Sequence, residues 1–91
     1  MFVVQCKDKP GHGPVRAENR AAHLEHLKAH LDRVVLAGPI QSEDRQSMLG
    51  SVLVLDFAER AELDAFLAAD PYARAGLFES VTVLPFKKVL P

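Results

Sequence analysis

Hydrophobic residues along this chain fall into short blocks whose spacing alternates between that of strands and that of helices. Residues Phe2–Cys6 form a β-prone run, and a loop rich in proline and glycine follows over residues 7–14. From Val15 to about Leu31 the residues are good helix formers, and apolar side chains recur every three or four positions. The chain is therefore expected to begin with a strand and an amphipathic helix.

Two further strands are predicted in the middle of the chain. Val34–Ala37 form an apolar run closed by Gly38 and Pro39, and the polar stretch within residues 39–49 predicts an exposed loop. Residues 52–55 are apolar without interruption and include β-branched side chains, which favours a central strand over a helix.

The last third of the chain predicts a helix, a short turn and a closing strand. Glu59 to about Ala69 show the periodicity of a second amphipathic helix. Pro71 forces Asp70 out of helical dihedrals, so Asp70 is expected to cap a short helical turn that ends at Gly76. Residues 78–86 form the final strand, whose late proline predicts an edge position or a bulge.

The resulting order is β-α-β-β-α-β, which is the order of the ferredoxin-like α+β fold. This fold places two helices on one face of a four-stranded antiparallel sheet and leaves the other face open. Residues 52–55 are apolar on both faces of their strand, although two helices can cover only one face. We therefore expect a homodimer, or a higher homo-oligomer, that buries the open face.

Composition and charge narrow the choice of partners. Residues 1–91 are expected to form a single domain, because a chain of this length has no room for two. Hydrophobic residues make up 48% of the sequence, which is too many for a disordered chain. Lysine and arginine number 11 against 12 aspartates and glutamates, and the net charge of −1 argues against nucleic acid as a partner.

Neither a membrane nor an export route is expected. The longest apolar stretches have four or five residues, whereas a membrane-spanning helix needs about 20. The first residues also lack the basic segment of a signal peptide. The single cysteine, Cys6, cannot form an internal disulfide and fits a reducing compartment. We expect a cytoplasmic protein in which Cys6 is a small buried residue.

Two polar side chains of the first predicted helix could carry chemistry. Leu24, Leu27 and Leu31 define an apolar stripe on a helical wheel. Arg20 falls in the middle of this stripe, where it either reaches out to solvent or a structural carboxylate, or holds an anion at the edge of a pocket. His23 lies at the border of the stripe. An imidazole there either is structural or transfers protons near neutral pH, since its ordinary pKa is about 6.5.

Metals and organic cofactors are not expected. His26 and His30 have the i, i+4 spacing of some zinc-binding pairs, but no third ligand lies near them in the sequence. Prolines interrupt the glycine-containing segment 10–14, which therefore lacks the pattern of a phosphate-binding loop. The sequence also has no Gly-x-Ser-x-Gly motif of a nucleophilic serine.

Ser51 and Asp70 each allow two interpretations. Ser51, at the start of the third predicted strand, either donates a hydrogen bond to a ligand or closes a turn. Asp70 either only caps its helical turn or also orients a histidine ring and raises its basicity. Because the second helix returns along the same sheet face as the first, Asp70 and Tyr72 are expected to approach His23. His23 and Asp70 should then lie within hydrogen-bond reach, with Arg20, Ser51 and Tyr72 near a bound ligand.

Short motifs in a fixed order resemble the YCII-related (YciI-like) family. The resemblance extends from Phe2 to Val89 and rests on Arg20-x-x-His23-Leu24, Ala37-Gly38-Pro39, Gly50-Ser51, Asp70-Pro71-Tyr72 with Ala75-Gly76-Leu77, and Pro85-Phe86-Lys87. It implies a ferredoxin-like fold that pairs into a dimeric α+β barrel. It also implies a pocket between helix and sheet that is lined by the histidine and aspartate of these motifs, here His23 and Asp70.

The same resemblance implies an activity. Related barrel families include muconolactone isomerase, and lyases that remove chloride from chlorinated hydroxyquinols resemble this family directly. These reactions share the removal and return of a proton on a small anionic, often cyclic or aromatic-derived, substrate. His23, Asp70 and Arg20 would supply a base, a group that orients it and an anion holder. The expected function is that of a cofactor-independent lyase or isomerase, and the alternative is a non-catalytic module that binds a small ligand.

Overall fold

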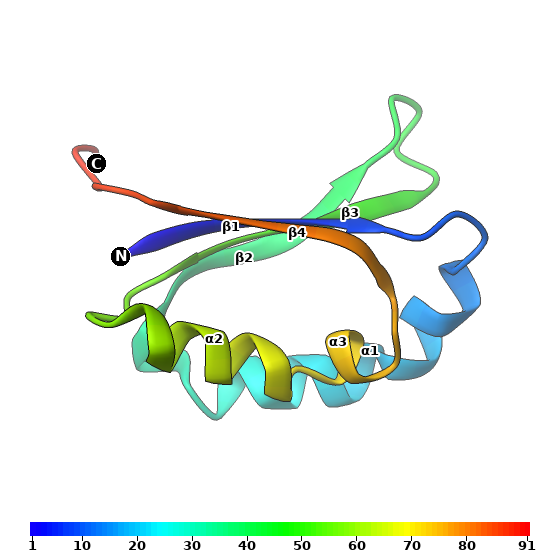
Figure 1. Cartoon of the computed structure of the whole chain (residues 1–91). Helices are drawn as coiled ribbons and strands as arrows, with labels where there is room; N and C mark the ends of the chain where they lie inside the picture. The colour runs from blue at the N-terminus through cyan, green and yellow to red at the C-terminus, as the bar shows by residue number, and fades with distance from the viewer.

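Four antiparallel strands form one sheet, and all the helices lie on one side of it (Figure 1). The computed structural model describes residues 1–91. Its elements, in chain order, are β1 (Phe2–Asp8), α1 (Gly13–Lys28), the 3-10 turn η1 (Leu31–Arg33), β2 (Val34–Gln41), β3 (Met48–Leu55), α2 (Arg60–Ala69), α3 (Pro71–Arg74) and β4 (Phe78–Pro85). The strands lie in the order β2-β3-β1-β4. The predicted α+β, ferredoxin-like arrangement is confirmed.

The hydrophobic core lies between the sheet and the helices. Alternate residues of β1 and β3 face the helices, as the two-residue period of a strand requires, and Val4 pairs with Leu53 in the sheet. The buried cluster comprises Val4, Cys6, Leu27, Leu53, Leu55, Phe57, Leu63 and Phe66. Burial, followed by the charges of Asp70 and Asp8, raises the pKa of the Cys6 thiol to about 12. Cys6 is thus the small buried residue that the sequence predicts, whereas the cytoplasmic location stays a prediction.

The two middle strands in the sequence, β2 and β3, extend beyond their predicted limits. β2 continues through Gly38 and Pro39 to Gln41, and β3 begins at Met48, so the connecting loop covers only residues 42–47. The prediction that Gly38 and Pro39 end the strand was therefore wrong. β2 lies at one edge of the sheet, and an edge strand tolerates a proline because one side of its backbone needs no partner. β4 forms the other edge, as predicted from Pro85.

Helix α1 ends three residues before its predicted limit. It stops at Lys28 because the chain must turn to enter β2, and Leu31 instead begins η1 with 66% of its surface exposed. The apolar stripe that included Leu31 was therefore placed wrongly. The buried residues of α1 are Arg16, His23 and Leu27.

A helical wheel of the first helix turns His26 toward solvent, but the structure places it against α2. Its Nε2–H donates to the carbonyl oxygen of Phe66 at 2.9 Å, and its ring stacks on the Phe66 ring with centroids 4.4 Å apart. His26 therefore joins α1 to α2, a contact that a helical wheel of α1 alone does not show.

The junction between α2 and α3 follows the sequence prediction closely. Asp70 has an extended conformation, with φ −63° and ψ 128°, and its carboxylate accepts the backbone N–H of Tyr72. Pro71 is the first residue of α3, and Gly76 has a positive φ of 71° after the helix ends. The cap at Asp70 therefore fixes the direction in which its side chain leaves the backbone.

The sheet face opposite the helices carries apolar side chains. Val54 is 6% exposed, which agrees with the prediction that β3 is buried on both faces. Around it, Leu36 and Leu84 remain 53% and 57% exposed.

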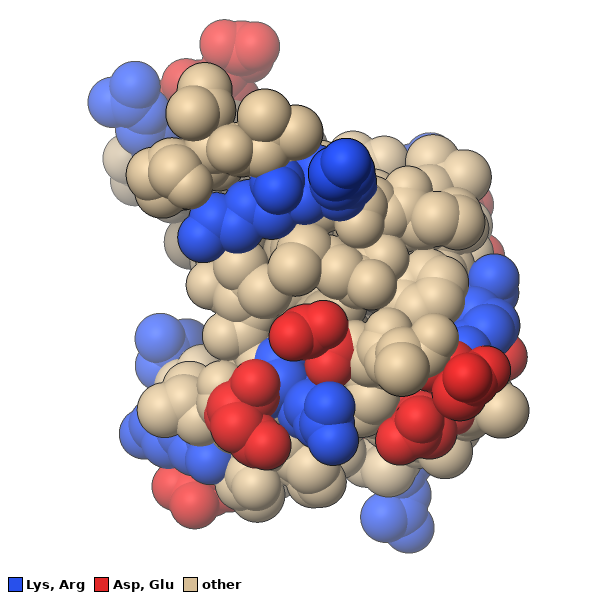
Figure 2. Space-filling view, turned by 90° about the vertical axis from the view of Figure 1, so that its left-hand side faces the viewer, with Lys and Arg blue, Asp and Glu red and all other residues tan.

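None of the helices combines the length and the apolar character that crossing a membrane requires. On the face drawn in Figure 2, acidic and basic side chains are intermixed.

Candidate functional site

A cavity of about 1050 Å³ opens between helix α1 and the strands β2 and β3. Its walls come from the end of β1, the loop before α1, the α1 face, the β2–β3 hairpin and Tyr72 of α3. The polar side chains that line it include Asp8, Arg16, Arg20, His23, Ser51 and Tyr72. The cavity is therefore built from elements that meet only in the folded chain.

His23 and Asp70 are in direct contact, as their predicted proximity requires. His23 Nδ1 lies 2.9 Å from each carboxylate oxygen of Asp70, and Oδ1 also accepts the backbone N–H of Tyr72 at 2.9 Å. A nitrogen that faces a carboxylate carries the proton, so Nδ1 donates and Nε2 is left as an acceptor in the neutral ring. Asp70 sits behind His23, outside the cavity wall. The contact is confirmed, and the catalytic roles stay predictions.

Tyr72 supports the histidine from the side. Its ring is stacked on that of His23, with centroids 3.9 Å apart and planes inclined by 12°. Tyr72 is almost completely buried, and this burial raises the pKa of its hydroxyl. The positive charge of Arg16 lowers this pKa, but by less than burial raises it. The ring of His23 is thus held by a carboxylate at one nitrogen and by an aromatic face along its plane.

Arg16 is the main site residue that the sequence analysis missed. This residue is only 8% exposed. Its Nε and Nη2 donate to the two oxygens of Asp8 at 2.7 and 3.0 Å, and Nη2 also donates to Ser51 Oγ at 2.9 Å. Burial alone would lower the pKa of Arg16, but the hydrogen bond and charge of Asp8 raise it above its ordinary value. The signal was available, because Arg16 lies one turn before Arg20 on the same helix face.

Arg20 lines the cavity, which agrees with the interpretation that places it at the edge of a pocket. Its side chain is exposed and forms no ion pair in the structure. The side chain reaches solvent at the cavity, and its role as an anion holder stays a prediction. Ser51 lies inside β3 and not at a turn, since the strand begins at Met48. Its hydroxyl is buried and faces Arg16.

The structure brings together no set of three His, Cys, Asp or Glu side chains that could hold a metal ion. His26 and His30 have ring centroids 5.5 Å apart, and each ring donates to a backbone carbonyl.

Comparisons with known proteins agree with this architecture. The model of the YCII-related domain matches residues 1–87. The chain is 34% identical to the protein YciI of Escherichia coli O6:H1 over 96 positions, which cover 98% of each chain. The crystal structure of PA3566 from Pseudomonas aeruginosa superposes with a TM-score of 0.58 at 13% identity, covering 98% of this chain and 92% of that one, and shows likeness of fold alone.

A second solved structure, which contains a bound ligand, is more similar to this chain than PA3566 is. This is 5-chloro-2-hydroxyhydroquinone dehydrochlorinase (TftG) from Burkholderia phenoliruptrix AC1100, in complex with 2,5-dihydroxybenzoquinone. It has a TM-score of 0.88 and 33% identity, and the match covers 94% of this chain and 92% of that one. The family match over nearly the whole chain, the identity to YciI and the agreement in fold lead to one conclusion: the chain belongs to the YCII-related family.

Proposed function

We propose that the protein is an enzyme that transfers a proton on a small, oxygen-bearing cyclic anion, with His23 as the general base. The observation that supports this proposal best is the contact of His23 Nδ1 with both oxygens of Asp70 at 2.9 Å. This contact keeps the proton on Nδ1 and leaves Nε2 unprotonated beside the cavity. Asp70 acts as a positioning residue, because it lies behind the ring.

The proposed step needs only groups of this chain and the substrate. Nε2 of neutral His23 accepts a proton from an acidic O–H or C–H of the substrate, and the bonding electron pair stays on the substrate. Return of the proton to another substrate atom gives an isomerisation. Departure of a leaving group such as chloride with an electron pair gives an elimination. The imidazolium that forms in between is stabilised by the Asp70 carboxylate.

The charges at the cavity favour an anionic substrate. Arg20 and Lys9 line the cavity, are exposed and form no ion pair in the structure. The likeness to the dehydrochlorinase TftG, which was crystallised with 2,5-dihydroxybenzoquinone, supports hydroxylated quinones and hydroquinones as the substrate class. Such ring compounds become anionic when one acidic hydroxyl group ionises, and another O–H or a C–H of the same ring supplies the proton.

We also propose that two copies pair through the open sheet face. Leu36 and Leu84 are large apolar side chains exposed on this face, and no helix of the same chain covers it (Figure 1). Pairing would remove this apolar surface from water and enlarge the thin core of a short chain. Sedimentation at micromolar concentration should give a dimer or a higher assembly, and a monomer that is unchanged by concentration would contradict the proposal.

The test of activity begins with binding. A panel of hydroxylated quinones and hydroquinones is screened by thermal shift, since a ligand at 100 times its Kd stabilises by about 2.7 kcal/mol. For a chain of this length, that stabilisation raises the Tm by roughly 10 °C or more. Ligands that bind are then followed for turnover by absorbance and product analysis.

Matched variants connect the activity to the site. His23→Asn should abolish turnover, whereas His30→Asn, at an exposed position just beyond the end of the same helix, should leave it unchanged. Asp70→Asn should lower turnover strongly, and the exposed Asp64→Asn should not. Binding without turnover across the panel would indicate the ligand-binding module instead of the enzyme. Turnover that survives His23→Asn would overturn the role of the histidine.

A further inference from the structure

One side of the edge strand β2 faces the helices but is not covered by them. Ala37 pairs with Leu53 of the core, and paired side chains point to the same face of a sheet. Pro39 pairs in the same way with Ser51, which bonds to Arg16 of α1. Leu53 and Ser51 are each 3% exposed, whereas no residue of β2 is buried. The helices therefore cover this face only as far as β3 and leave a groove between α1 and β2.

This groove is part of the cavity, and its lining is apolar. The lining side chains that solvent reaches are Leu24 of α1, Ala37 and Pro39 of β2, and Met48 of β3. The buried Leu27 and Leu53 also line the cavity. These six side chains define the apolar groove. None of them offers a hydrogen bond, so a polar substituent would lose its water here without gaining a partner. The groove therefore suits an apolar group.

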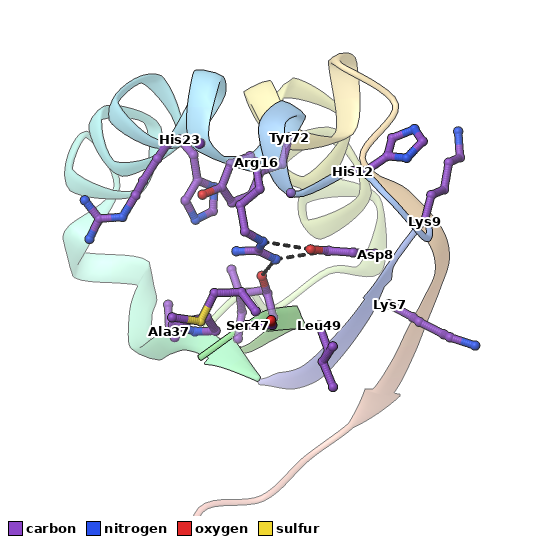
Figure 3. Close-up of a pocket in the computed structure, with 18 of the residues that line it drawn as sticks. Lys7, Asp8, Lys9, His12, Arg16, His23, Ala37, Ser47, Leu49 and Tyr72 are labelled. Atoms are coloured by element: carbon purple, nitrogen blue, oxygen red, sulfur yellow. Dashed lines mark hydrogen bonds and ion pairs between the residues drawn. The ribbon is translucent and has the colours of Figure 1, made fainter. Parts of the chain in front are cut away.

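The apolar groove adjoins the proposed base. Leu27 follows His23 by one helical turn, so both side chains lie on the same face of α1. Figure 3 shows Ala37 across the hollow from the His23 ring, with the ion pair of Arg16 and Asp8 to one side. The hydrogen-bonding groups and the apolar groove thus occupy different parts of one cavity, and a molecule bound at His23 can reach both.

The cavity is larger than a single ring requires. Its volume is about 1050 Å³, whereas pockets of about 300–1,000 Å³ already hold drug-sized ligands and bury most of their surface. A quinone with one six-membered ring and no side chain would leave the apolar groove empty. Apolar surface in contact with water is unfavourable, so a substituent that fills the groove adds to affinity in proportion to the area it covers.

A ligand fits the groove better than a second copy of the chain does. The proposed pairing uses the opposite face of the sheet, where Leu36 and Leu84 are exposed. Pairing of a further strand at the edge of β2 is also hindered, because Pro39 has no N–H to donate. The groove is continuous with the cavity that contains His23, and this continuity favours part of the substrate as its occupant.

We propose that the apolar groove binds an alkyl side chain on the ring of the substrate, an inference that rests on the proposed function. The ring lies beside His23, and the chain runs along β2 past Ala37 and Pro39. These two residues are about 7 Å apart along the strand, since a strand rises about 3.4 Å per residue. A propyl to pentyl chain spans this length. The preferred substrates are therefore hydroxylated quinones or hydroquinones that carry such a side chain.

The experiment compares 2,5-dihydroxybenzoquinone with derivatives that carry a methyl, propyl, pentyl or heptyl group on one ring carbon. The unsubstituted carbons of this quinone are equivalent, so each chain length gives a single compound. Binding to the native protein is measured by calorimetry. We expect the Kd to fall about two- to fourfold per methylene group up to pentyl, so that the Kd of the unsubstituted quinone is roughly 30 times that of the pentyl compound or more. Heptyl should add little, because its end reaches solvent.

Two variants test whether the chain lies in the groove. Ala37→Phe fills it, and the variant should fold because the position is exposed and phenylalanine is favoured in strands. The ratio of the two Kd values, unsubstituted over pentyl, should fall below about 3. Met48→Gln makes the side chain polar and should lower this ratio about threefold. A general change of the cavity cancels, since both ligands are compared in the same variant. Ala61→Phe, at an exposed position of α2 outside the cavity, should keep the native ratio.

The outcomes separate the groove from the proposed function. Absence of binding of every compound to the native protein contradicts the proposed function. Binding of all compounds with equal Kd overturns the role of the groove alone. A native ratio that persists in both Ala37→Phe and Met48→Gln also overturns it, because the chain then binds elsewhere. If circular dichroism shows that Ala37→Phe is unfolded, Met48→Gln decides, since it changes only an exposed side chain at the start of β3.

Discussion

Replacing Asp70 by asparagine is expected to move the ring proton of His23 from Nδ1 to Nε2. In the native site both Asp70 oxygens lie 2.9 Å from Nδ1, and Oδ1 also accepts the backbone N–H of Tyr72. The introduced asparagine must present its single side-chain oxygen to Tyr72 in order to keep the cap, and this turns its NH₂ group toward Nδ1. The amide then donates to Nδ1, so the ring must carry its proton on Nε2.

The variant should remain folded at a moderate loss of stability. The cap is retained because asparagine caps helices as well as aspartate. The two contacts with Nδ1 share one proton, so one hydrogen bond to a charged group is replaced by a neutral one, at a cost of about 1 kcal/mol. For a chain of this length, the Tm should fall by roughly 5 °C. Turnover should fall about 10⁴-fold, the effect of the same replacement in a serine protease triad, because Nε2 no longer accepts a proton.

The proton position can be measured without a substrate. Nitrogen-15 NMR that correlates ring nitrogens with carbon-bound protons identifies the protonated nitrogen of each neutral histidine, and His23→Asn assigns the signal. We expect Nδ1–H in the native protein and in the exposed control Asp64→Asn, and Nε2–H in Asp70→Asn. A native His23 protonated at Nε2, or an unchanged signal in Asp70→Asn, refutes the reasoning.

Three further predictions concern stability and assembly. Burial raises the pKa of Cys6 from 9.0 to about 12, so its contribution to stability is complete below about pH 9 and is lost as the pH rises toward 12. At about pH 10.5 the free energy of unfolding, measured in urea, should have fallen by about 2 kcal/mol more in the native protein than in Cys6→Ala. The same dependence of this free energy on pH in both proteins would contradict the prediction. Gly50→Ala should cost at least about 2 kcal/mol because the new Cβ would overlap the Cys6 carbonyl oxygen, whereas Gly38→Ala has open space and should cost less than about 1 kcal/mol in the same assay. Leu84→Glu should produce monomers in sedimentation and Leu31→Glu, on the helix side, should not; equal assembly of both would exclude the open face as the interface.

The order of elements could be predicted because each segment carries its own periodicity and its own boundary residues. The two-residue period, the helical period and the Pro71 to Gly76 turn are local properties of the chain. The end of β2 could not be predicted in this way. Whether Pro39 breaks a strand depends on the place of that strand in the sheet, and an edge position is decided by the pairing of all four strands.

The contact between His23 and Asp70 could be expected because topology and a cap fix it. Arg16 and Asp8 could not be found in the same way. The predicted helix included Leu31, which lies outside α1 in the structure. The apolar stripe on the helical wheel was therefore centred on Arg20 and not on Arg16. The pairing of Arg16 with Asp8 also depends on the path of residues 9–12, which return the chain from β1 to α1. Such a pairing is a tertiary contact with no periodic signal.

Arg16 and Arg20 lie one turn apart on α1, yet their surroundings suit different tasks in the proposed enzyme. Asp8 cancels the charge of Arg16 at contact distance, so any effect of Arg16 on a ligand would come from directed hydrogen bonds and not from its net charge. Arg20 has no ion-pair partner and is exposed, so its field reaches an approaching anion and is screened beyond about 8–10 Å by salt. Capture of the substrate should therefore depend on ionic strength through Arg20. A hydrogen bond from the buried Arg16 to a ligand should depend on ionic strength much less, because that contact would form away from solvent.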